Sequence, residues 1–106
     1  MPHQHHHAVR HATLETLAVL QPLLGELRDL KGLVERTPGA FYLKSRAFLH
    51  FHESPTGTYA DVKFDLVNFT RVRVTSKQEQ ATFLERVRSC LCLGNATSAK
   101  SLKRTI

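Results

Sequence analysis

The sequence predicts an α+β domain with an N-terminal helix, three or four antiparallel strands in a meander, and a C-terminal helix. Apolar residues near the start of the chain, and again after Ser76, recur at the three- and four-residue spacing of a helix. Between these segments, apolar and polar residues alternate as they do in half-buried strands. The alternating segments are residues 46–53, 59–65 and 69–75. A chain of 106 residues is long enough for one domain with its own core.

The first helix is expected over residues 8–33, where leucines form a stripe. Pro22 lacks a backbone N–H and crowds the preceding turn, so we expect a kink or two helices that meet there. Gly32 is expected to end the helix. A leucine stripe of this kind is typical of packing against a sheet. It comprises Leu14, Leu17, Ala18, Leu20, Leu23, Leu24, Leu27 and Leu30, with Val34 following.

The central hairpin has a register that can be counted from its turn, Ser54-Pro-Thr-Gly57. Closing the hairpin over these four residues pairs Glu53 with Thr58 and His50 with Asp61, and it sets Arg46 against Asp65 as an ion pair. A slip of one residue would mix apolar and polar side chains, so the register is strongly specified. The apolar face comprises Ala47, Leu49, Phe51, Ala60, Val62 and Phe64.

The segments on either side of the hairpin are less regular. Residues 35–39 are expected to form a connector, and residues 40–44 form either a further short strand or part of one long, bulged strand. Ser76 and Glu79 have the spacing of a capping box, which predicts the start of the C-terminal helix. Gly94 is expected to end that helix.

The third strand completes a face of the sheet that nothing else in the chain covers. Counting from a turn at residues 66–68 places Arg73 opposite Asp61 and Lys63 opposite Arg71. Both helices must cover the apolar face, which leaves the other face open. This open face is predicted to carry Phe48, His50, His52, Tyr59, Asp61, Lys63, Arg71 and Arg73.

Three kinds of binding are considered for the open face, because its aromatic and imidazole side chains suggest that something covers it. The first is homodimerisation or binding of a protein partner. The second is a nucleotide or single-stranded nucleic acid, stacked on Phe48 and Tyr59 with basic side chains near the phosphates. The third is a divalent metal such as zinc, held by His50 and His52 with Asp61 alongside and Glu53 at the strand end.

An enzyme would use His50 as a base oriented by Asp61. No serine, threonine or cysteine is placed next to this pair as a nucleophile, and no phosphate-cradling glycine loop is present. The sequence therefore favours a non-catalytic binding module without a required cofactor, with a protein partner or a second copy of the chain as the first expectation.

Composition limits the compartment and the partners. The formal net charge is +6, but Lys100, Lys103 and Arg104 lie in a tail, so the balance permits weak phosphate binding without demanding it. Cys90 and Cys92 are two residues apart in a helical pattern and are poorly placed to pair. No apolar run approaches membrane-spanning length, which favours a cytoplasmic protein with no membrane contact.

The two ends of the chain are expected to be disordered around a single domain of residues 8–94. Residues 1–7 form a histidine-rich terminus that could bind metals where it is exposed, or that is a flexible end or a purification-tag remnant. Residues 95–106 form a basic tail rich in serine, threonine and lysine.

The hairpin also resembles a known group of proteins. The run Arg46-Ala-Phe-Leu-His-Phe-His-Glu53, followed by Gly57-x-Tyr-Ala-Asp-Val62 and preceded by residues 35–39, is similar to a family of small bacterial proteins with no assigned activity. The resemblance covers roughly residues 27–88. The order of elements is also similar to that of the MmcQ/YjbR proteins, sometimes described as DNA-binding. This second resemblance implies a fold and no site residue.

Overall fold

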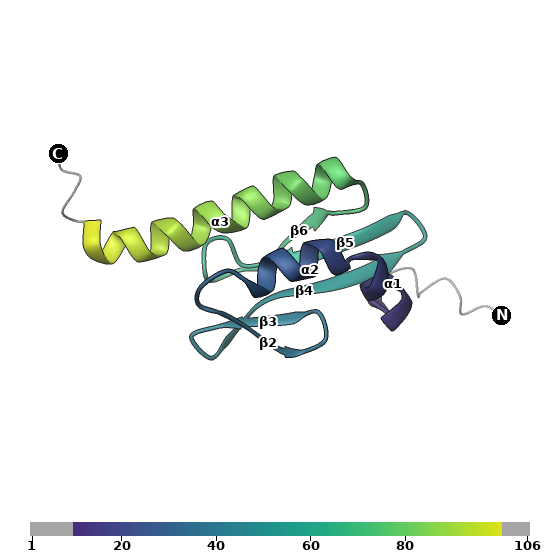
Figure 1. Cartoon of the computed structure of the whole chain (residues 1–106), viewed down its shortest axis with the longest axis horizontal. Helices are drawn as coiled ribbons and strands as arrows, with labels where there is room; N and C mark the ends of the chain where they lie inside the picture. Colours follow the sequence, from purple (N-terminus) through teal and green to yellow (C-terminus); the bar gives the residue numbers. More distant parts are fainter. Residues whose placement is uncertain (1–9, 101–106) are drawn as a thin grey trace.

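The computed structural model describes residues 10–100 and has the α+β architecture that the sequence predicts. Two short helices precede the main strands of the sheet, and one long helix follows them (Figure 1). The helices are α1 (Leu14–Val19), α2 (Gln21–Arg28) and α3 (Lys77–Lys100). The strands are β1 (Arg10–His11), β2 (Leu33–Thr37), β3 (Ala40–Leu43), β4 (Arg46–Ser54), β5 (Gly57–Val62) and β6 (Thr70–Arg73).

The sheet is an antiparallel meander in the order β2-β3-β4-β5-β6. β5 pairs with Leu49 to Ser54 along one edge of β4. The other edge of β4 is shared, because β3 pairs with its first half and β1 with His52 and Glu53. The meander thus has five strands, one more than the upper number expected. The additional strand is β2, which was expected to be the end of a helix and a connector.

The hydrophobic core lies between the sheet and the helices, which gather on the same face, as predicted (Figure 1). Leu27 of α2, Val62 of β5 and Phe83 of α3 are fully buried in it. Because all three described helices lie on this face, the opposite face of the sheet is open, as expected. None of the helices in residues 10–100 is long and apolar enough to cross a bilayer.

The N-terminal helical segment is broken near Pro22, as predicted. α1 ends at Val19, and Pro22 lies in the first turn of α2, where its missing N–H costs no hydrogen bond. The expectation that Gly32 ends the helix is wrong, because α2 ends at Arg28. Gly32 has a φ of +97°, which suits glycine, and it leads into β2.

The predicted register of the central hairpin is confirmed over five residue pairs. Leu49 pairs with Val62, His50 with Asp61 and Glu53 with Thr58. The turn is tighter than expected, since Ser54 also pairs with Gly57 and only two residues remain between them.

A bulge in β4 overturns the predicted placement of Phe48. Phe41 of β3 pairs with Leu49, but its neighbour Tyr42 pairs with Ala47, so Phe48 is an extra residue on β4. Phe48 consequently turns into the core and is only 1% exposed, whereas Ala47, expected in the core, is exposed.

The same irregularity changes the far end of the hairpin. Arg46 pairs with Leu43 of β3, and β5 ends at Val62, before it could reach Asp65. The predicted pairing of Arg46 with Asp65 is therefore wrong. The Asp65 carboxylate instead accepts hydrogen bonds from two backbone N–H groups that follow it, those of residues 67 and 68.

The register of β6 is shifted by two residues from the one predicted. Asp61 pairs with Arg71 and Tyr59 with Arg73. The predicted turn at residues 66–68 was too short, because the chain between β5 and β6 spans residues 63–69. A shift of two preserves which face each side chain occupies, so both arginines still reach the open face.

The capping box at the start of α3 is confirmed. The Glu79 N–H donates to Ser76 Oγ, and the Ser76 N–H donates to Glu79 Oε1. The prediction that Gly94 ends this helix is wrong, because α3 continues to Lys100. An isolated glycine costs a helix only about 1 kcal/mol, and no proline follows it. Residues 95–100 are therefore helical, whereas the predicted disorder of residues 1–7 and 101–106 lies outside the described residues.

Candidate metal centre on the open face

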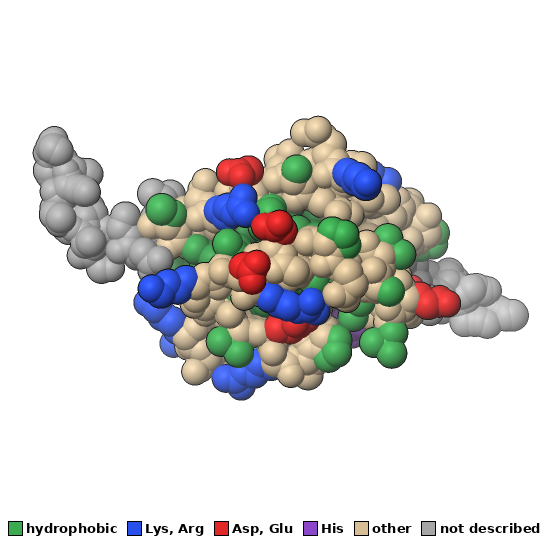
Figure 2. Space-filling view, viewed as in Figure 1, with side chains coloured by type: hydrophobic (Ala, Val, Ile, Leu, Met, Phe, Trp, Pro, Cys, Tyr) green, Lys and Arg blue, Asp and Glu red, His purple; other side chains and the backbone are tan. Residues whose placement is uncertain are grey.

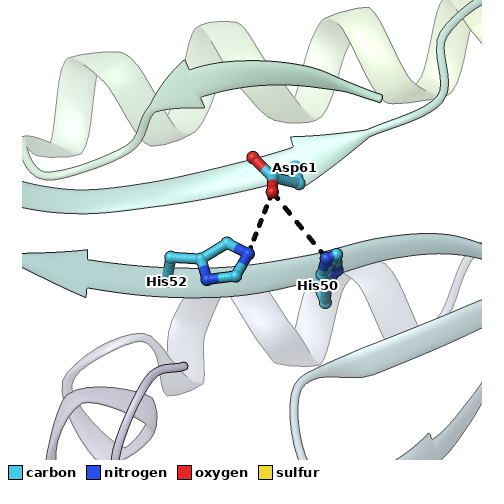
Figure 3. Close-up of side chains that lie close together, drawn as sticks. All are labelled: His50, His52 and Asp61. Atoms are coloured by element: carbon cyan, nitrogen blue, oxygen red, sulfur yellow. Dashed lines mark ion pairs between the residues drawn. The ribbon is translucent and has the colours of Figure 1, made fainter. Parts of the chain in front are cut away.

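Three residues named from the sequence come together at the middle of the open face. His50 and His52 project from β4, and Asp61 projects from β5, directly opposite His50. Figure 3 looks onto this face, with the helices behind the strands. Figure 2 looks onto the helix-covered side, from which the histidines are almost hidden. The alternation of β4 beyond its bulge produces this arrangement, because residues 50 and 52 point the same way.

One carboxylate oxygen is the meeting point of the cluster. Oδ2 of Asp61 lies 2.9 Å from Nε2 of His52 and 3.8 Å from Nε2 of His50 (Figure 3). One ligand atom from each of these three residues falls within 4.8 Å of the others. The two imidazole rings meet edge to face, with centroids 4.8 Å apart.

Both ring nitrogens of His52 are buried without hydrogen bonds. Among residues 10–100, the buried side-chain nitrogen and oxygen atoms that lack a hydrogen-bond partner are both nitrogens of His52. Its Nε2 is close to Asp61, but the two groups are not aligned well enough to form a hydrogen bond. A buried polar atom without a partner costs about 1–3 kcal/mol. His52 therefore has donor and acceptor capacity that the surrounding protein leaves unused.

Arg71 of β6 fixes the position of the Asp61 carboxylate. Its Nε donates to Oδ1 at 2.7 Å, and its Nη2 donates to Oδ2 at 2.8 Å. These hydrogen bonds hold the pKa of Asp61 below its ordinary value, against the opposing effect of burial. Asp61 is thus an ionised carboxylate with 9% of its surface exposed, and its plane is set by the guanidinium.

His50 also contacts Phe69, a residue that the sequence analysis did not name on the open face. The rings of His50 and Phe69 meet edge to face with their centroids 4.9 Å apart, and the Lys63 ammonium lies 4.8 Å from the Phe69 centroid. Burial lowers the pKa of His50, the nearby His52 lowers it further, and Asp61 opposes the shift. A lowered pKa keeps the imidazole neutral near pH 7, which is the form that binds metals.

His11 is a further member of the cluster that was missed from the sequence. It lies on β1, opposite His52, and its ring stacks on that of His52 with centroids 5.1 Å apart. Its ring centroid is 6.0 Å from that of His50. A two-residue strand leaves no periodic signal in a sequence, so counting along the strands did not place His11 on the open face.

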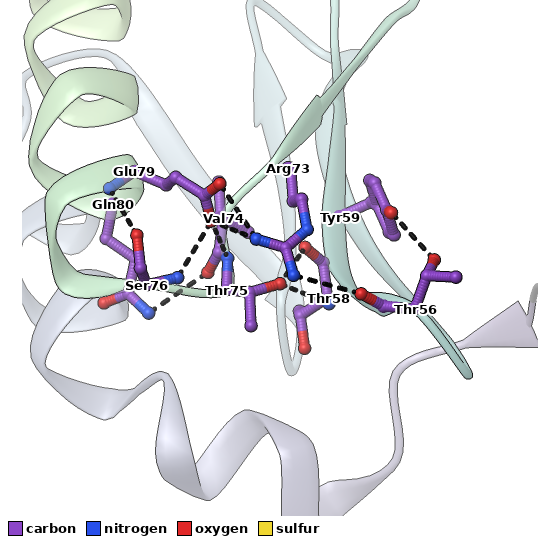
Figure 4. A network of polar contacts seen from close by, with 9 residues as sticks. All are labelled: Thr56, Thr58, Tyr59, Arg73, Val74, Thr75, Ser76, Glu79 and Gln80. Carbon is purple, nitrogen blue, oxygen red and sulfur yellow. Dashed lines mark hydrogen bonds and ion pairs between the residues drawn. The ribbon is translucent and has the colours of Figure 1, made fainter.

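The remaining candidates lie outside the cluster. Tyr59 is held by Thr56 through a hydroxyl contact of 2.8 Å. Arg73 donates to both carboxylate oxygens of Glu79 and to the Thr56 carbonyl, which ties β6 to the start of α3 (Figure 4). Glu53, expected beside the histidines, accepts hydrogen bonds from Thr13 at the start of α1. Phe48 lies in the core.

The donor set has the composition of a zinc site. Two imidazole nitrogens and one carboxylate oxygen are common ligands of zinc, with metal–ligand distances near 2.1 Å. Tetrahedral ligands at that distance lie roughly 3.4 Å apart. The atoms of the cluster, which lie within 4.8 Å of one another, need small rotations of the side chains to reach that spacing.

Comparison with known proteins gives no match from which a function could be inferred, so the function has to be argued from the geometry of the cluster. No protein-family model, curated protein or solved structure matches the chain.

Proposed function

We propose that this protein is a non-catalytic binding module whose open face holds a divalent transition metal, zinc in the first place, through His50, His52 and Asp61. The observation that carries the proposal is the imidazole of His52, whose two nitrogens are buried without a hydrogen-bond partner. Its Nε2 lies 2.9 Å from an ionised carboxylate. An ion between these groups would use the lone pair that the protein leaves without a partner.

The role of Arg71 agrees with this proposal. Carboxylates that bind a metal are commonly held by a second group, which keeps their orientation before the ion arrives. Arg71 holds Asp61 in this way, and Oδ2, which accepts the hydrogen bond from Nη2, also lies toward both imidazoles. The guanidinium also adds a positive charge, so the site is expected to favour ions that form strong bonds to nitrogen. Such ions are zinc, nickel and copper, in contrast to magnesium and calcium.

The zinc content of the purified protein tests the proposal, provided that the terminal histidines are first replaced so that they cannot bind zinc. The full chain with His3, His5, His6 and His7 each replaced by glutamine, here called the tract-substituted protein, is expected to bind one zinc ion per chain. Adding His50→Gln and His52→Gln to it should abolish this binding, because two of the three ligands are lost. Elemental analysis after dialysis against zinc, together with titration calorimetry, measures both.

Tyr59→Phe in the same background is the matched control, since Tyr59 lies on the open face but outside the cluster. It is expected to retain one zinc ion with unchanged affinity. Equal zinc content in the protein with and without His50 and His52 would refute the proposal, as would an absence of zinc from the tract-substituted protein.

A second candidate function is homodimerisation through the open face. The loop between β5 and β6, beside this face, exposes 53% of Leu66, 69% of Val67 and 43% of Phe69. Exposed apolar side chains in a group favour a protein contact. Light scattering over a concentration series is expected to show the mass rising toward twice that of the chain, and Val67→Ser with Phe69→Ser is expected to keep it at one chain. A single-chain mass at the highest concentration would exclude this function.

The geometry gives less support to nucleic-acid binding. Of the two aromatic side chains proposed to stack on bases, Phe48 is in the core. Arg71 and Arg73 each donate two hydrogen bonds to a carboxylate, so a phosphate would have to displace Asp61 or Glu79.

A further inference from the structure

We propose that His11 is a fourth metal ligand, which closes the coordination sphere and clamps the N-terminal strand β1 onto β4. This inference rests on the proposed metal site and extends it from three ligands to four. A site with four protein ligands is structural in character, whereas a site with three keeps a position open for water or another small ligand.

The backbone pairing of β1 brings His11 toward the cluster. His11 pairs with His52, and the N–H of the next residue, Ala12, donates to the carbonyl of Phe51 at 3.2 Å. This pattern makes His11 and His52 a pair without hydrogen bonds between their own backbones. In such pairs the Cα atoms are only about 4.5 Å apart, and the side chains approach most closely.

The side chain of His11 is free to complete the site. It is exposed, and its ring lies over that of His52 at an interplanar angle of 29°. Rotation about its two side-chain torsions moves a ring nitrogen by several ångströms without moving β1. Three histidines and one carboxylate would then surround the ion, as in tetrahedral zinc sites.

Within the described residues, β1 makes a short contact with the sheet. It is two residues long and pairs with β4 alone. Beside it, between β1 and the β2–β3 turn, lies a hollow of about 410 Å³ whose lining includes His11 and His50. If His11 were not a ligand, a small molecule in this hollow could reach the fourth position on the metal. The hollow therefore defines the alternative that the experiment must distinguish.

Cobalt spectroscopy with azide tests whether the fourth position is closed. In the tract-substituted protein, bound Co²⁺ is expected to give the intense visible bands of a tetrahedral site, and azide should leave them unchanged. His11→Phe keeps a flat ring against His52 but cannot coordinate. In this variant azide is expected to change the spectrum, and the affinity for Co²⁺ should fall by about tenfold or more.

Limited proteolysis gives a second, independent measurement, because trypsin cleaves after Arg10. If the metal clamps β1, zinc should slow this cleavage in the tract-substituted protein and leave it unchanged in the His11→Phe variant. Thermodynamic linkage also predicts how much zinc should slow the cleavage after Arg10. The factor by which zinc slows cleavage should equal the factor by which His11→Phe weakens zinc binding, as long as opening is fast compared with cleavage.

The outcomes separate this inference from the function on which it rests. Azide-sensitive spectra in both proteins, with cleavage after Arg10 indifferent to zinc, would overturn the role of His11 and leave the site of His50, His52 and Asp61 intact. Absence of metal binding from the tract-substituted protein would overturn both. An azide response and a loss of protection confined to the His11→Phe variant would establish the clamp.

Discussion

Phe48→Ala is expected to lower the free energy of unfolding by about 3–5 kcal/mol, as measured by urea denaturation. The side chain is 1% exposed and belongs to the core cluster with Phe41, Leu49 and Val62. Truncation removes the apolar contacts of a whole ring and leaves a cavity that the neighbouring strands cannot fill. The bulge in β4 makes the cost large, because it turns Phe48 away from the open face.

Ala47→Ser is the matched control for this prediction. Ala47 precedes the bulge and is exposed, so the change should alter the free energy of unfolding by less than about 0.5 kcal/mol. Uninterrupted alternation along β4 would give the opposite ranking, with Phe48 on the open face and Ala47 in the core. A small effect at residue 48 with a large effect at residue 47 would therefore show that the bulge is absent.

Asp61→Asn, studied with a chelator present, is expected to destabilise the protein by about 2 kcal/mol at neutral pH. The variant loses two charge-assisted hydrogen bonds from Arg71, each of the kind worth about 1.5–3 kcal/mol where water is excluded. The expected total is reduced because Arg71 is 44% exposed and the solvent screens its charge. Chemical denaturation at several pH values measures the difference between the two proteins.

The pH dependence of this difference follows from the pKa of Asp61. Arg71 lowers that pKa in the folded protein, so the ion pair contributes fully above the unfolded value of about 3.9 and is lost as the pH falls through the lower folded value. The stability difference between wild type and Asp61→Asn should persist down to about pH 5 and shrink below pH 4. A difference that stays constant to pH 2 would show that folding leaves the pKa of Asp61 unshifted, and that the ion pair with Arg71 adds no stability.

Counting along the strands predicted the faces of the sheet better than the pairs within it. Side chains alternate with a period of two, so His50, His52, Asp61 and Arg71 were assigned to the open face even though the register of β6 was shifted. The pairing of β4 with β5 was correct from Leu49 to Glu53, because a tight turn fixes it there. The pairing of β5 with β6 depended on a longer loop, whose length a sequence pattern does not specify.

The remaining errors came from features without periodicity. Nothing in the run around Phe48 indicates that one residue bulges, because the bulge arises from pairing with β3. Val34 continues a helical leucine pattern yet lies in β2, where tertiary pairing overrides a local preference. His11 reaches the cluster through two residue pairs with β4 that are forty or more positions away in the chain. Part of the candidate site could therefore be counted from the sequence, and part required the fold.

The outer strands of the meander bear on how copies of this protein could meet. β6 is four residues long and carries Arg71 and Arg73, and β2, at the opposite border, carries Glu35 and Arg36. Short, charged border strands oppose the addition of a foreign strand, which is the usual route to amyloid-like growth. Continuous growth of the sheet from chain to chain is thus disfavoured, so the pairing of two chains proposed above would join their open faces.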